Sequence, residues 1–409
     1  MVYWIVGLFI LSVLLRSAFL VCVTGTDRPL EGDEPEYHAV SVLFANGDGW
    51  GVDGQKSKRS PLISFLASGL YFLLGTDASA SRWMFVFFSS LTSPLVFIVV
   101  NKMSKRYDVG ILVAVAWALY PPSIWYAGLI TTETMSSLLV VATVGVFVWA
   151  ATSQGIWHVV VAGLVFGLLS LNRSLYLFLP VALMITQVIL SRVTTLEWSW
   201  SGRQWALCLI VFSITMAPWT IHNYVEHGVF MPHSTQSGML LLITNGTLDN
   251  QFISRGMYYK NPELIARVYN GSDSEVGRDR LARAIAIAEI KKNWHLLPKA
   301  VVNRAKNFWT PRPDPYNHGW TINDLIMIMI WVPVLIFFLS SSMIRSWGKY
   351  WPMLAIIGYA FLLTLPFWGT PRFRFPVDAL ILCGGVMGFL EVIHLVVPSV
   401  ASQIQKKIR

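Results

Sequence analysis

Ten apolar runs separated by short polar joints dictate what this chain can fold into. An apolar run of about 17–25 residues can cross a bilayer as a helix, because a helix satisfies its backbone polar groups internally. Charged residues make up only 13% of the 409 residues, against about a quarter in soluble domains. The sequence therefore predicts an all-α polytopic membrane protein with about ten transmembrane helices. The runs lie near residues 3–23, 82–101, 109–128, 132–152, 156–171, 174–191, 205–221, 322–343, 351–368 and 376–397.

The basic residues in the joints predict the orientation of these helices, because Lys and Arg accumulate in cytoplasmic loops. With a cytoplasmic N-terminus, the cytoplasmic joints receive Lys102, Lys105, Arg106, Arg192, Arg203, Arg345 and Lys349, and the tail Gln-Lys-Lys-Ile-Arg. We therefore expect an integral protein of the plasma (inner) membrane with both termini in the cytoplasm. Two long segments, about 24–81 and 222–321, then lie outside the cytoplasm.

This pattern divides the chain into three parts. Residues 1–221 form an N-terminal transmembrane bundle, which includes the outer loop 24–81 with interfacial helices near 37–44 and 61–75. Residues 222–321 form an extracytoplasmic loop or subdomain, with a helix expected at 274–294. Residues 322–409 supply the C-terminal transmembrane helices and a basic cytoplasmic tail.

The outer loop opens with an unusual density of acid, in the stretch Glu-Gly-Asp-Glu-Pro-Glu-Tyr that begins at Glu31. Proline favours the first helical position, which makes Glu34 the expected N-cap and places Glu36 in the first turn. Capping leaves Glu31 and Asp33 without an explanation. A carboxylate at Asp33 with like charges nearby is a candidate general base, and the same cluster is a candidate site for a divalent cation. The residues alone leave these two alternatives open.

Basic side chains are expected on the same face. In an extended Phe-Trp-Gly-Thr-Pro-Arg-Phe-Arg segment, Arg372 and Arg374 would point the same way and converge on one anion, since guanidinium groups suit phosphate. Arg173 is a further phosphate candidate. Glu133, at the start of a predicted span, is a helix-start carboxylate or, with Glu34, a candidate second acid. The spacing of His222, His227 and His233 matches no tight zinc pattern, which favours polar cleft-lining residues.

In the order of its motifs, the chain resembles the C-type (GT-C) membrane glycosyltransferases, in particular the protein O-mannosyltransferase-like superfamily with its lipid A aminoarabinose transferases. The first motif is Gly-Asp-Glu-x-x-Tyr in the outer loop, followed by a Lys-Arg-Ser-Pro-Leu start of an apolar helix at Lys58. The others are the Pro-Arg-Phe-Arg-Phe-Pro segment and a run carried by Pro218, Trp219, Asn223, Tyr224, Gly228, Phe230 and Pro232. The resemblance covers most of residues 1–235 and 365–395.

This resemblance implies a GT-C-like bundle and transfer of a sugar, with inversion, from a polyprenyl-phosphate donor outside the cytoplasm. Asp33 would be the base that deprotonates the acceptor hydroxyl. Arg372 and Arg374, with Arg173, would hold the donor phosphate. The cleft would be lined by Tyr37, Lys58, Arg59, His222 and Asn223. Two departures concern His222, where the family usually has Arg, and Ser60, which separates Arg59 from Pro61.

The resemblance also sets the partners and the open questions. The expected partners are the lipid-linked donor, an acceptor that is a lipid, a glycan or a protein, and the bilayer, with no nucleic acid. No cofactor is certain; a divalent cation, if used, would lie near Asp33 and Glu34. The rival functions are a lipid or glycan transporter or flippase, and a glycan ligase that uses a lipid-diphosphate donor.

Overall fold

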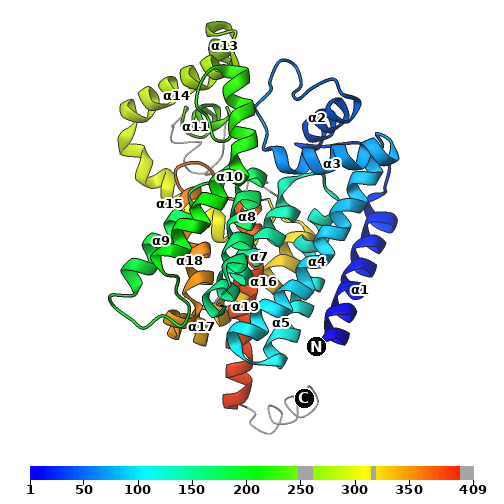
Figure 1. The fold of residues 1–409 in the computed structure, drawn as a ribbon, viewed down its shortest axis with the longest axis vertical. Coiled ribbons are helices and arrows are strands. Elements are labelled where there is room, and N and C mark those ends of the chain that lie inside the picture. The colour runs from blue at the N-terminus through cyan, green and yellow to red at the C-terminus, as the bar shows by residue number, and fades with distance from the viewer. Residues whose placement is uncertain (154, 247–260, 315–318, 397–409) are drawn as a thin grey trace.

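The computed structural model describes residues 1–153, 155–246, 261–314 and 319–396 of the chain (Figure 1). These residues form helices and loops, with one isolated antiparallel bridge between Val52 and Gln55, so the predicted all-α class is confirmed. The helices of the membrane bundle are α1 (Val2–Phe19), η1 (Leu20–Thr24), α4 (Ala78–Ser104), α5 (Tyr107–Leu119), α6 (Pro121–Trp125), η2 (Tyr126–Gly128), α7 (Thr132–Thr152), α8 (Ile156–Asn172), η3 (Ser174–Tyr176), α9 (Leu179–Leu190), α10 (Gly202–His227), α16 (Ile322–Ser340), α17 (Ser342–Arg345), α18 (Trp347–Thr364) and α19 (Pro371–Val396).

Six helical segments among the described residues are long and apolar enough to cross a bilayer, and a bent pair makes a seventh. The bent pair joins α5 to α6 and η2 at an angle of 59°. The remaining predicted runs form α8, η3 with α9, and α18. Each predicted run is therefore helical, but the count of ten crossing helices is not confirmed. The six segments are Val2–Thr24, Ala78–Ser104, Thr132–Thr152, Gly202–His227, Ile322–Arg345 and Pro371–Val396.

The bend between α5 and α6 explains why Arg16 can be buried within the first apolar run. Pro121 and Pro122 follow Tyr120 and lack backbone N–H groups, so the helix cannot continue and carbonyl oxygens are freed. The buried side chain of Arg16 enters this region, where it donates to Ser89 Oγ (2.7 Å) and Ser123 Oγ (3.1 Å). Arg16 therefore faces the bundle and satisfies polar groups that lipid would leave unpaired.

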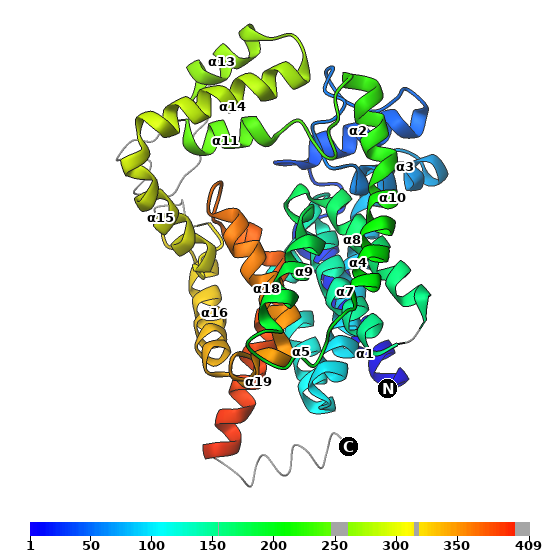
Figure 2. The same ribbon diagram turned by 60° about the vertical axis from the view of Figure 1, so that its left-hand side comes forward.

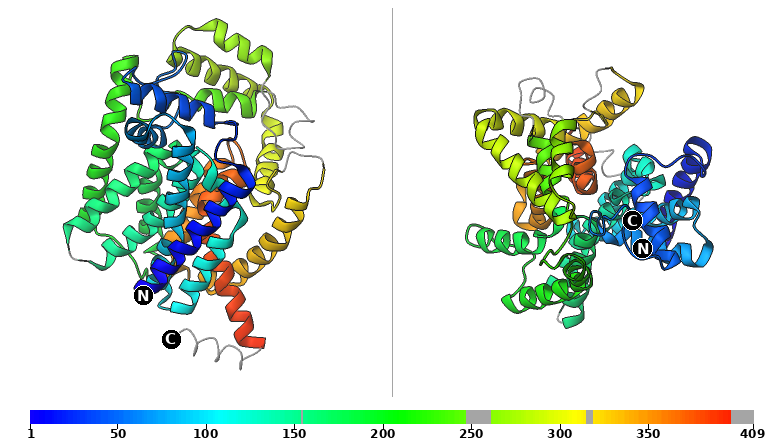
Figure 3. Two further views of the ribbon diagram at one scale, coloured as in Figure 1. Left: turned by 90° about the vertical axis from the view of Figure 1, so that its right-hand side faces the viewer. Right: turned by 90° about the horizontal axis from the view of Figure 1, so that it is seen from above.

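The two long polar segments lie at the same end of the bundle, which we call the head end (Figures 1 and 2). The left view of Figure 3 shows the same arrangement, with the start of α1 at the opposite end. The predicted helix 274–294 is confirmed as α14, whereas the predicted boundary at residue 222 falls inside α10. The head-end helices are α2 (Glu34–Asn46), α3 (Pro61–Leu74), α11 (Ser237–Asn245), α13 (Pro262–Gly271), α14 (Glu275–Lys292), η4 (Trp294–Leu296) and α15 (Leu297–Trp309).

The opposite end gathers the basic joints. Lys105 follows α4, and its Nζ lies 3.6 Å from Oε1 of Glu197. Lys349 is in α18, and its Nζ lies 3.9 Å from Oε2 of the same carboxylate. Three joints that the sequence assigned to one side of the membrane are thus in contact. The basic tail of the chain, residues 397–409, lies outside the described residues.

Small residues allow α16 and α19 to approach closely. Gly384 and Gly388 are one turn apart on α19, in the small-xxx-small spacing that lets membrane helices pack backbone to backbone. A Cβ on Gly388 would lie 2.0 Å from the carbonyl oxygen of Phe337 in α16. This contact fixes the position of α19, whose first turn contributes to the site described below.

We therefore expect Gly388→Ala to lower the melting temperature of the detergent-solubilised protein. The added methyl group meets a backbone atom, and overpacking of this kind costs about 1–3 kcal/mol. The matched control is Gly358→Ala in α18, where a Cβ would meet nothing within 4 Å. Alanine favours helices over glycine, so the control should keep or raise the melting temperature. Equal melting temperatures for the two variants would contradict close packing of α16 against α19.

Candidate functional site

The site is centred on Asp33, directly before α2. The helix begins at Glu34, so the N-cap is Asp33 and the predicted cap at Glu34 is wrong by one residue. The Asp33 carboxylate makes no capping hydrogen bond. Its Oδ1 accepts from Arg59 Nη2 (2.8 Å), and its Oδ2 accepts from Arg372 Nη2 (2.6 Å). Both oxygens are therefore held by guanidinium groups from segments far away in the sequence.

Arg372 joins two carboxylates across the head end. Its Nη2 binds Asp33, and its Nε donates to Glu133 Oε1 at 2.6 Å. Glu133 is in the first turn of α7 and has 0% of its side chain exposed, whereas Arg372 is 39% exposed. A buried carboxylate needs a cation or hydrogen bonds to offset the loss of water. Arg372 supplies both to Glu133 while its outer edge reaches the surface of the site.

Arg173 lies on the other side of Glu133. Its Nη1 is 3.6 Å from Glu133 Oε1, and its guanidinium stands 4.5 Å over the centre of the Phe373 ring. The Nη1 atom is buried and has no hydrogen-bond partner. An unsatisfied buried donor is costly, and in this structure the long ion pair with Glu133 only partly offsets that cost.

Lys58 and Arg59 complete the cationic side of the site. Lys58 Nζ donates to Glu36 Oε1 (2.8 Å), and Arg59 Nε donates to Glu36 Oε2 (2.6 Å). The Arg59 guanidinium lies 5.3 Å over the ring of Tyr37. The sequence predicts Glu36 only as a first-turn acid of the helix, and its pairing with Lys58 and Arg59 was not predicted. The adjacent basic residues Lys58 and Arg59 were visible in the sequence, but no local pattern indicates that this pair contacts the first turn of α2.

The charges around Asp33 control its proton affinity. Burial is the largest single influence and raises the pKa of Asp33. The charges of Arg372 and Arg59 and their hydrogen bonds together outweigh it, and the pKa falls from its ordinary 3.8 to about 2. The carboxylate is therefore ionised at every physiological pH, and it becomes a stronger base only when a guanidinium is drawn away from it.

Two cavities flank this ion network. The first, of about 630 Å³, is lined on one side by Tyr37, Lys58, Arg59 and Arg173, with further walls from the loop 229–237, from α14 and from the end of α18. The second, of about 500 Å³, contains Asp33, Glu34, Arg372, Trp125 and Tyr126 in its lining. Arg59 thus faces the first cavity and its partner Asp33 faces the second. The ion network is the partition between the two.

Arg374 does not share this site with Arg372. The predicted extended segment is wrong, because Pro371 starts α19 and residues two apart on a helix point in different directions. Arg374 is 1% exposed and donates to Asp378 Oδ1 (2.9 Å) and to the carbonyl oxygens of Phe308 and Thr310 (2.7 Å each). It lines neither of the two cavities.

The hydrogen bonds of Asp33 and Glu34 show whether these two residues could bind a divalent cation. Glu34 Oε1 accepts from Arg28 Nη2 (2.8 Å) and the Ile130 N–H (2.9 Å), and Oε2 accepts from the Glu31 N–H (3.0 Å). Since the oxygens of Asp33 and Glu34 already face cations or N–H groups, the two residues do not fit a divalent cation, which needs several free oxygen ligands. Within the described ranges, no group of three His, Cys, Asp or Glu residues could hold a metal ion.

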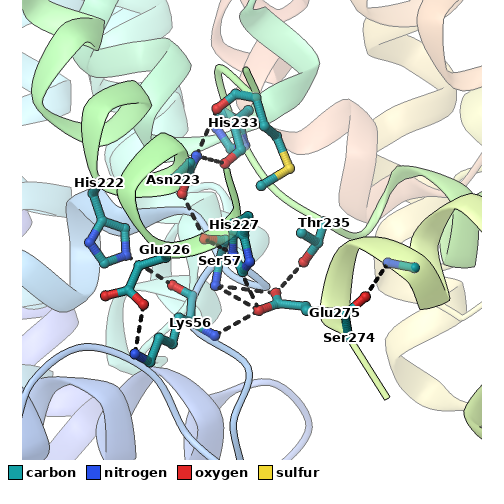
Figure 4. A network of polar contacts seen from close by, with 12 residues as sticks. Lys56, Ser57, His222, Asn223, Glu226, His227, His233, Thr235, Ser274 and Glu275 are labelled. Atoms are coloured by element: carbon teal, nitrogen blue, oxygen red, sulfur yellow. Dashed lines mark hydrogen bonds and ion pairs between the residues drawn. The ribbon is translucent and has the colours of Figure 1, made fainter. Parts of the chain in front are cut away.

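His222 and Asn223 belong to a separate polar network at the end of α10 (Figure 4). The His222 ring stacks on Trp219, with ring centres 4.8 Å apart. Asn223 is buried and donates to the carbonyl oxygens of Met231 (2.9 Å) and His233 (2.7 Å). Neither lines the two cavities, although His233 does line the first; burial lowers the pKa of His233 to about 4.

Comparison with known proteins identifies the fold. No family model matches the sequence, and no curated protein matches it. The archaeal oligosaccharyltransferase AglB from Archaeoglobus fulgidus, in complex with an inhibitory peptide and a dolichol-phosphate, superposes with a TM-score of 0.59 at 14% identity. The match covers 96% of this chain and 50% of AglB, so the chain spans about half the length of that enzyme.

Two other structures complete the comparison. AglB tethered to an acceptor peptide with the NVT sequon gives a TM-score of 0.60 at 13% identity, over 96% of this chain and 50% of that one. ArnT from Cupriavidus metallidurans, bound to undecaprenyl phosphate, gives a TM-score of 0.47 at 12% identity, over 98% and 80%. The described chain has the helical fold of the GT-C membrane glycosyltransferases, as the sequence resemblance indicated.

The ion network makes a prediction about stability. Arg372→Ala leaves the buried Glu133 carboxylate with Arg173 as its remaining ion-pair partner among the described residues. Breaking a fully buried pair costs about 3–5 kcal/mol, and the partial exposure of Arg372 should reduce this loss to about 2–3 kcal/mol. The double variant Arg372→Ala/Glu133→Gln removes the stranded charge and should recover much of this loss. Thermal unfolding in detergent measures both. Additive losses in the two single variants and the double variant would contradict direct coupling of the pair.

Proposed function

We propose that this protein is an inverting glycosyltransferase that moves a sugar from a polyprenyl-phosphate donor to an acceptor hydroxyl outside the cytoplasm. One observation carries the proposal: Asp33, a carboxylate that lines the second cavity, is hydrogen-bonded to Arg59, a cation that lines the first cavity with its cationic and apolar walls. The GT-C fold supports it, and AglB, which shares that fold, was solved with a dolichol-phosphate bound.

The first cavity suits a lipid phosphate. Lys58, Arg59 and Arg173 supply positive charge, and the buried Nη1 of Arg173 has no hydrogen-bond partner of its own. Apolar side chains continue from these cations along the same cavity, from Leu177, Phe178, Leu363 and Phe367. A phosphate head with a polyprenyl tail satisfies both parts, because guanidinium groups bind phosphate and the tail covers apolar surface.

The charge balance around the first cavity suits an anionic donor. Four cations (Lys58, Arg59, Arg173 and Arg372) face three carboxylates (Asp33, Glu36 and Glu133), which leaves one positive charge. Arg280, Arg283 and Asp279 also line the cavity and add one more. A sugar linked to a polyprenyl phosphate is a phosphodiester with one negative charge, which this excess of positive charge would stabilise.

The same charges connect donor binding to base catalysis. A phosphate that binds Arg59 from the first cavity competes with Asp33 for this guanidinium group, and the loss of this partner raises the pKa of Asp33. An acceptor hydroxyl in the second cavity then gives its proton to Asp33, and its oxygen forms a bond to the anomeric carbon. The bond from that carbon to the phosphate oxygen breaks on the opposite face, and the polyprenyl phosphate leaves with the electron pair.

The orientation in the membrane is part of the proposal. The basic joints at Lys105 and Lys349 lie at the end of the bundle opposite the site, and basic joints favour the cytoplasm. The site then faces outward from a plasma (inner) membrane. A lipid-linked donor suits this location, since it carries its activated sugar within the bilayer.

Asp33→Asn tests the base directly. Sugar transfer from a polyprenyl-phosphate-linked donor should fall by at least about 10²-fold, because the amide cannot take the hydroxyl proton. Binding of polyprenyl phosphate should persist or strengthen, since a competitor for the guanidinium group of Arg59 is removed. Asp48→Asn, an exposed acid in the loop after α2, is the matched control and should keep full activity. Near-normal transfer by Asp33→Asn would overturn the assignment.

Arg59→Ala should change the pH profile in a defined direction. The pKa of Asp33 is held at about 2, below its ordinary 3.8, so the carboxylate of the wild type loses activity to protonation only in strong acid. Removing Arg59 raises the pKa of Asp33 and moves the acid limb of kcat/KM for the donor to higher pH. The measurement is the pH of half-maximal kcat/KM rather than its amplitude. An unchanged acid limb would show that Asp33 is not the titrating base.

A further inference from the structure

Glu275, the first residue of α14, joins parts of the chain that lie far apart in the sequence. Its Oε2 accepts from the Lys56 N–H at 2.8 Å, and its Oε1 accepts from the Ser57 N–H at 3.2 Å (Figure 4). Thr235 Oγ1 also donates to Oε1. The Glu275 side chain is 8% exposed, so these charge-assisted bonds are shielded from water and correspondingly strong.

The far side of this contact is anchored in the membrane bundle. His227, at the end of α10, places its Nε2 2.8 Å from Ser57 Oγ and 3.7 Å from Glu275 Oε2. Ser57 Oγ in turn donates to Asn223 Oδ1 at 2.7 Å. The segment at Lys56 and Ser57 is therefore held between α14 and a long bundle helix.

The position of this segment decides where two cations lie. Lys58 and Arg59 follow Ser57 directly, both line the first cavity, and Arg59 reaches Asp33. Before Lys56, the chain is a loop with glycines at positive φ, including Gly51 (φ 113°) and Gly54 (φ 72°). Within the described loop 47–55, no helix or paired strand holds Lys58 and Arg59 from that side. The restraint comes from the contacts of Lys56 and Ser57, and Glu275 is the group that accepts from both of their N–H groups.

Glu275 also holds the opposite wall of the same cavity. The next turns of α14 contribute Val276, Asp279, Arg280 and Arg283 to the lining of the first cavity. One carboxylate thus fixes both the loop that carries Lys58 and Arg59 and the helix that faces them. The Glu275 contact therefore spans the two walls of this cavity.

We propose that Glu275 is a positioning residue of the donor site, which holds Lys58 and Arg59 and the α14 wall at the spacing that binds the phosphate of a lipid-linked donor. The inference rests on the proposed function and adds to it a residue that touches neither the donor nor Asp33. Glu275 acts through the backbone of Lys56 and Ser57.

The first arm of the test measures the anchor without any donor. Hydrogen–deuterium exchange of the full-length protein should be faster at residues 56–60 in Glu275→Ala, because two amide protons lose their acceptor. Glu263→Ala is the matched control, since Glu263 is the corresponding first-turn acid of α13. Its exchange at residues 56–60 should equal that of the wild type. Unchanged exchange in Glu275→Ala would overturn the anchor.

The second arm measures binding of undecaprenyl phosphate to the purified protein in nanodiscs. Affinity should fall about tenfold in Glu275→Ala, which corresponds to the loss of about one charge-assisted hydrogen bond. Glu275→Gln keeps one acceptor oxygen and should fall between Ala and the wild type, and Glu263→Ala should bind normally. In transfer assays, the KM for the donor should rise while kcat at saturating donor stays within about twofold.

These results separate the two hypotheses. Faster exchange with unchanged affinity in Glu275→Ala would overturn the positioning role while leaving the proposed function intact. A wild type that does not bind undecaprenyl phosphate would overturn the proposed function and the donor role with it, and the exchange arm would still decide whether Glu275 anchors the segment. A fall in kcat without a rise in donor KM would show general destabilisation and contradict positioning.

Discussion

The bridge that Arg372 makes between Asp33 and Glu133 organises the head end of this protein. It joins the start of α2, the start of α7 and the start of α19, and its two hydrogen bonds are both 2.6 Å long. Glu133 is buried without access to water, so the need to pair its charge ties these three helix ends together in addition to their apolar packing. The partition between the two cavities is a consequence of this bridge.

In the function we propose, Arg59 restrains Asp33 in the absence of donor and binds the phosphate when the donor enters. Most charges of the network are already paired before a donor binds, so the donor phosphate replaces one anion with another instead of meeting unpaired buried cations. Binding of an anion and release of the carboxylate then become the same event. Under the proposed mechanism, this exchange is what would allow a carboxylate with a pKa of about 2 to accept a proton.

Local sequence reasoning succeeded where a property depends on neighbouring residues. The apolar runs predicted the helices, and the mismatch between capping and Asp33 singled out the residue that Arg59 and Arg372 hold. The prediction for Arg374 was wrong because proline is compatible with two different backbone structures. Pro371 was taken as a rigid element of an extended segment, but proline is equally suited to the first turn of a helix, and the helix separates Arg374 from Arg372.

The sequence alone predicts the membrane-spanning helices, the side of the bundle on which the basic joints lie and the acidic patch before α2. These properties depend on the length of apolar runs and on charge, which are local quantities. The sequence alone does not predict the partners of those charges. Asp33, Glu133 and Arg372 are hundreds of residues apart at the extremes, and Glu275 meets Ser57 across 218 positions. Only the packing of the helices brings such groups within hydrogen-bond distance, and so the tertiary structure decided which acids are restrained, which cations face a cavity and where the two cavities meet.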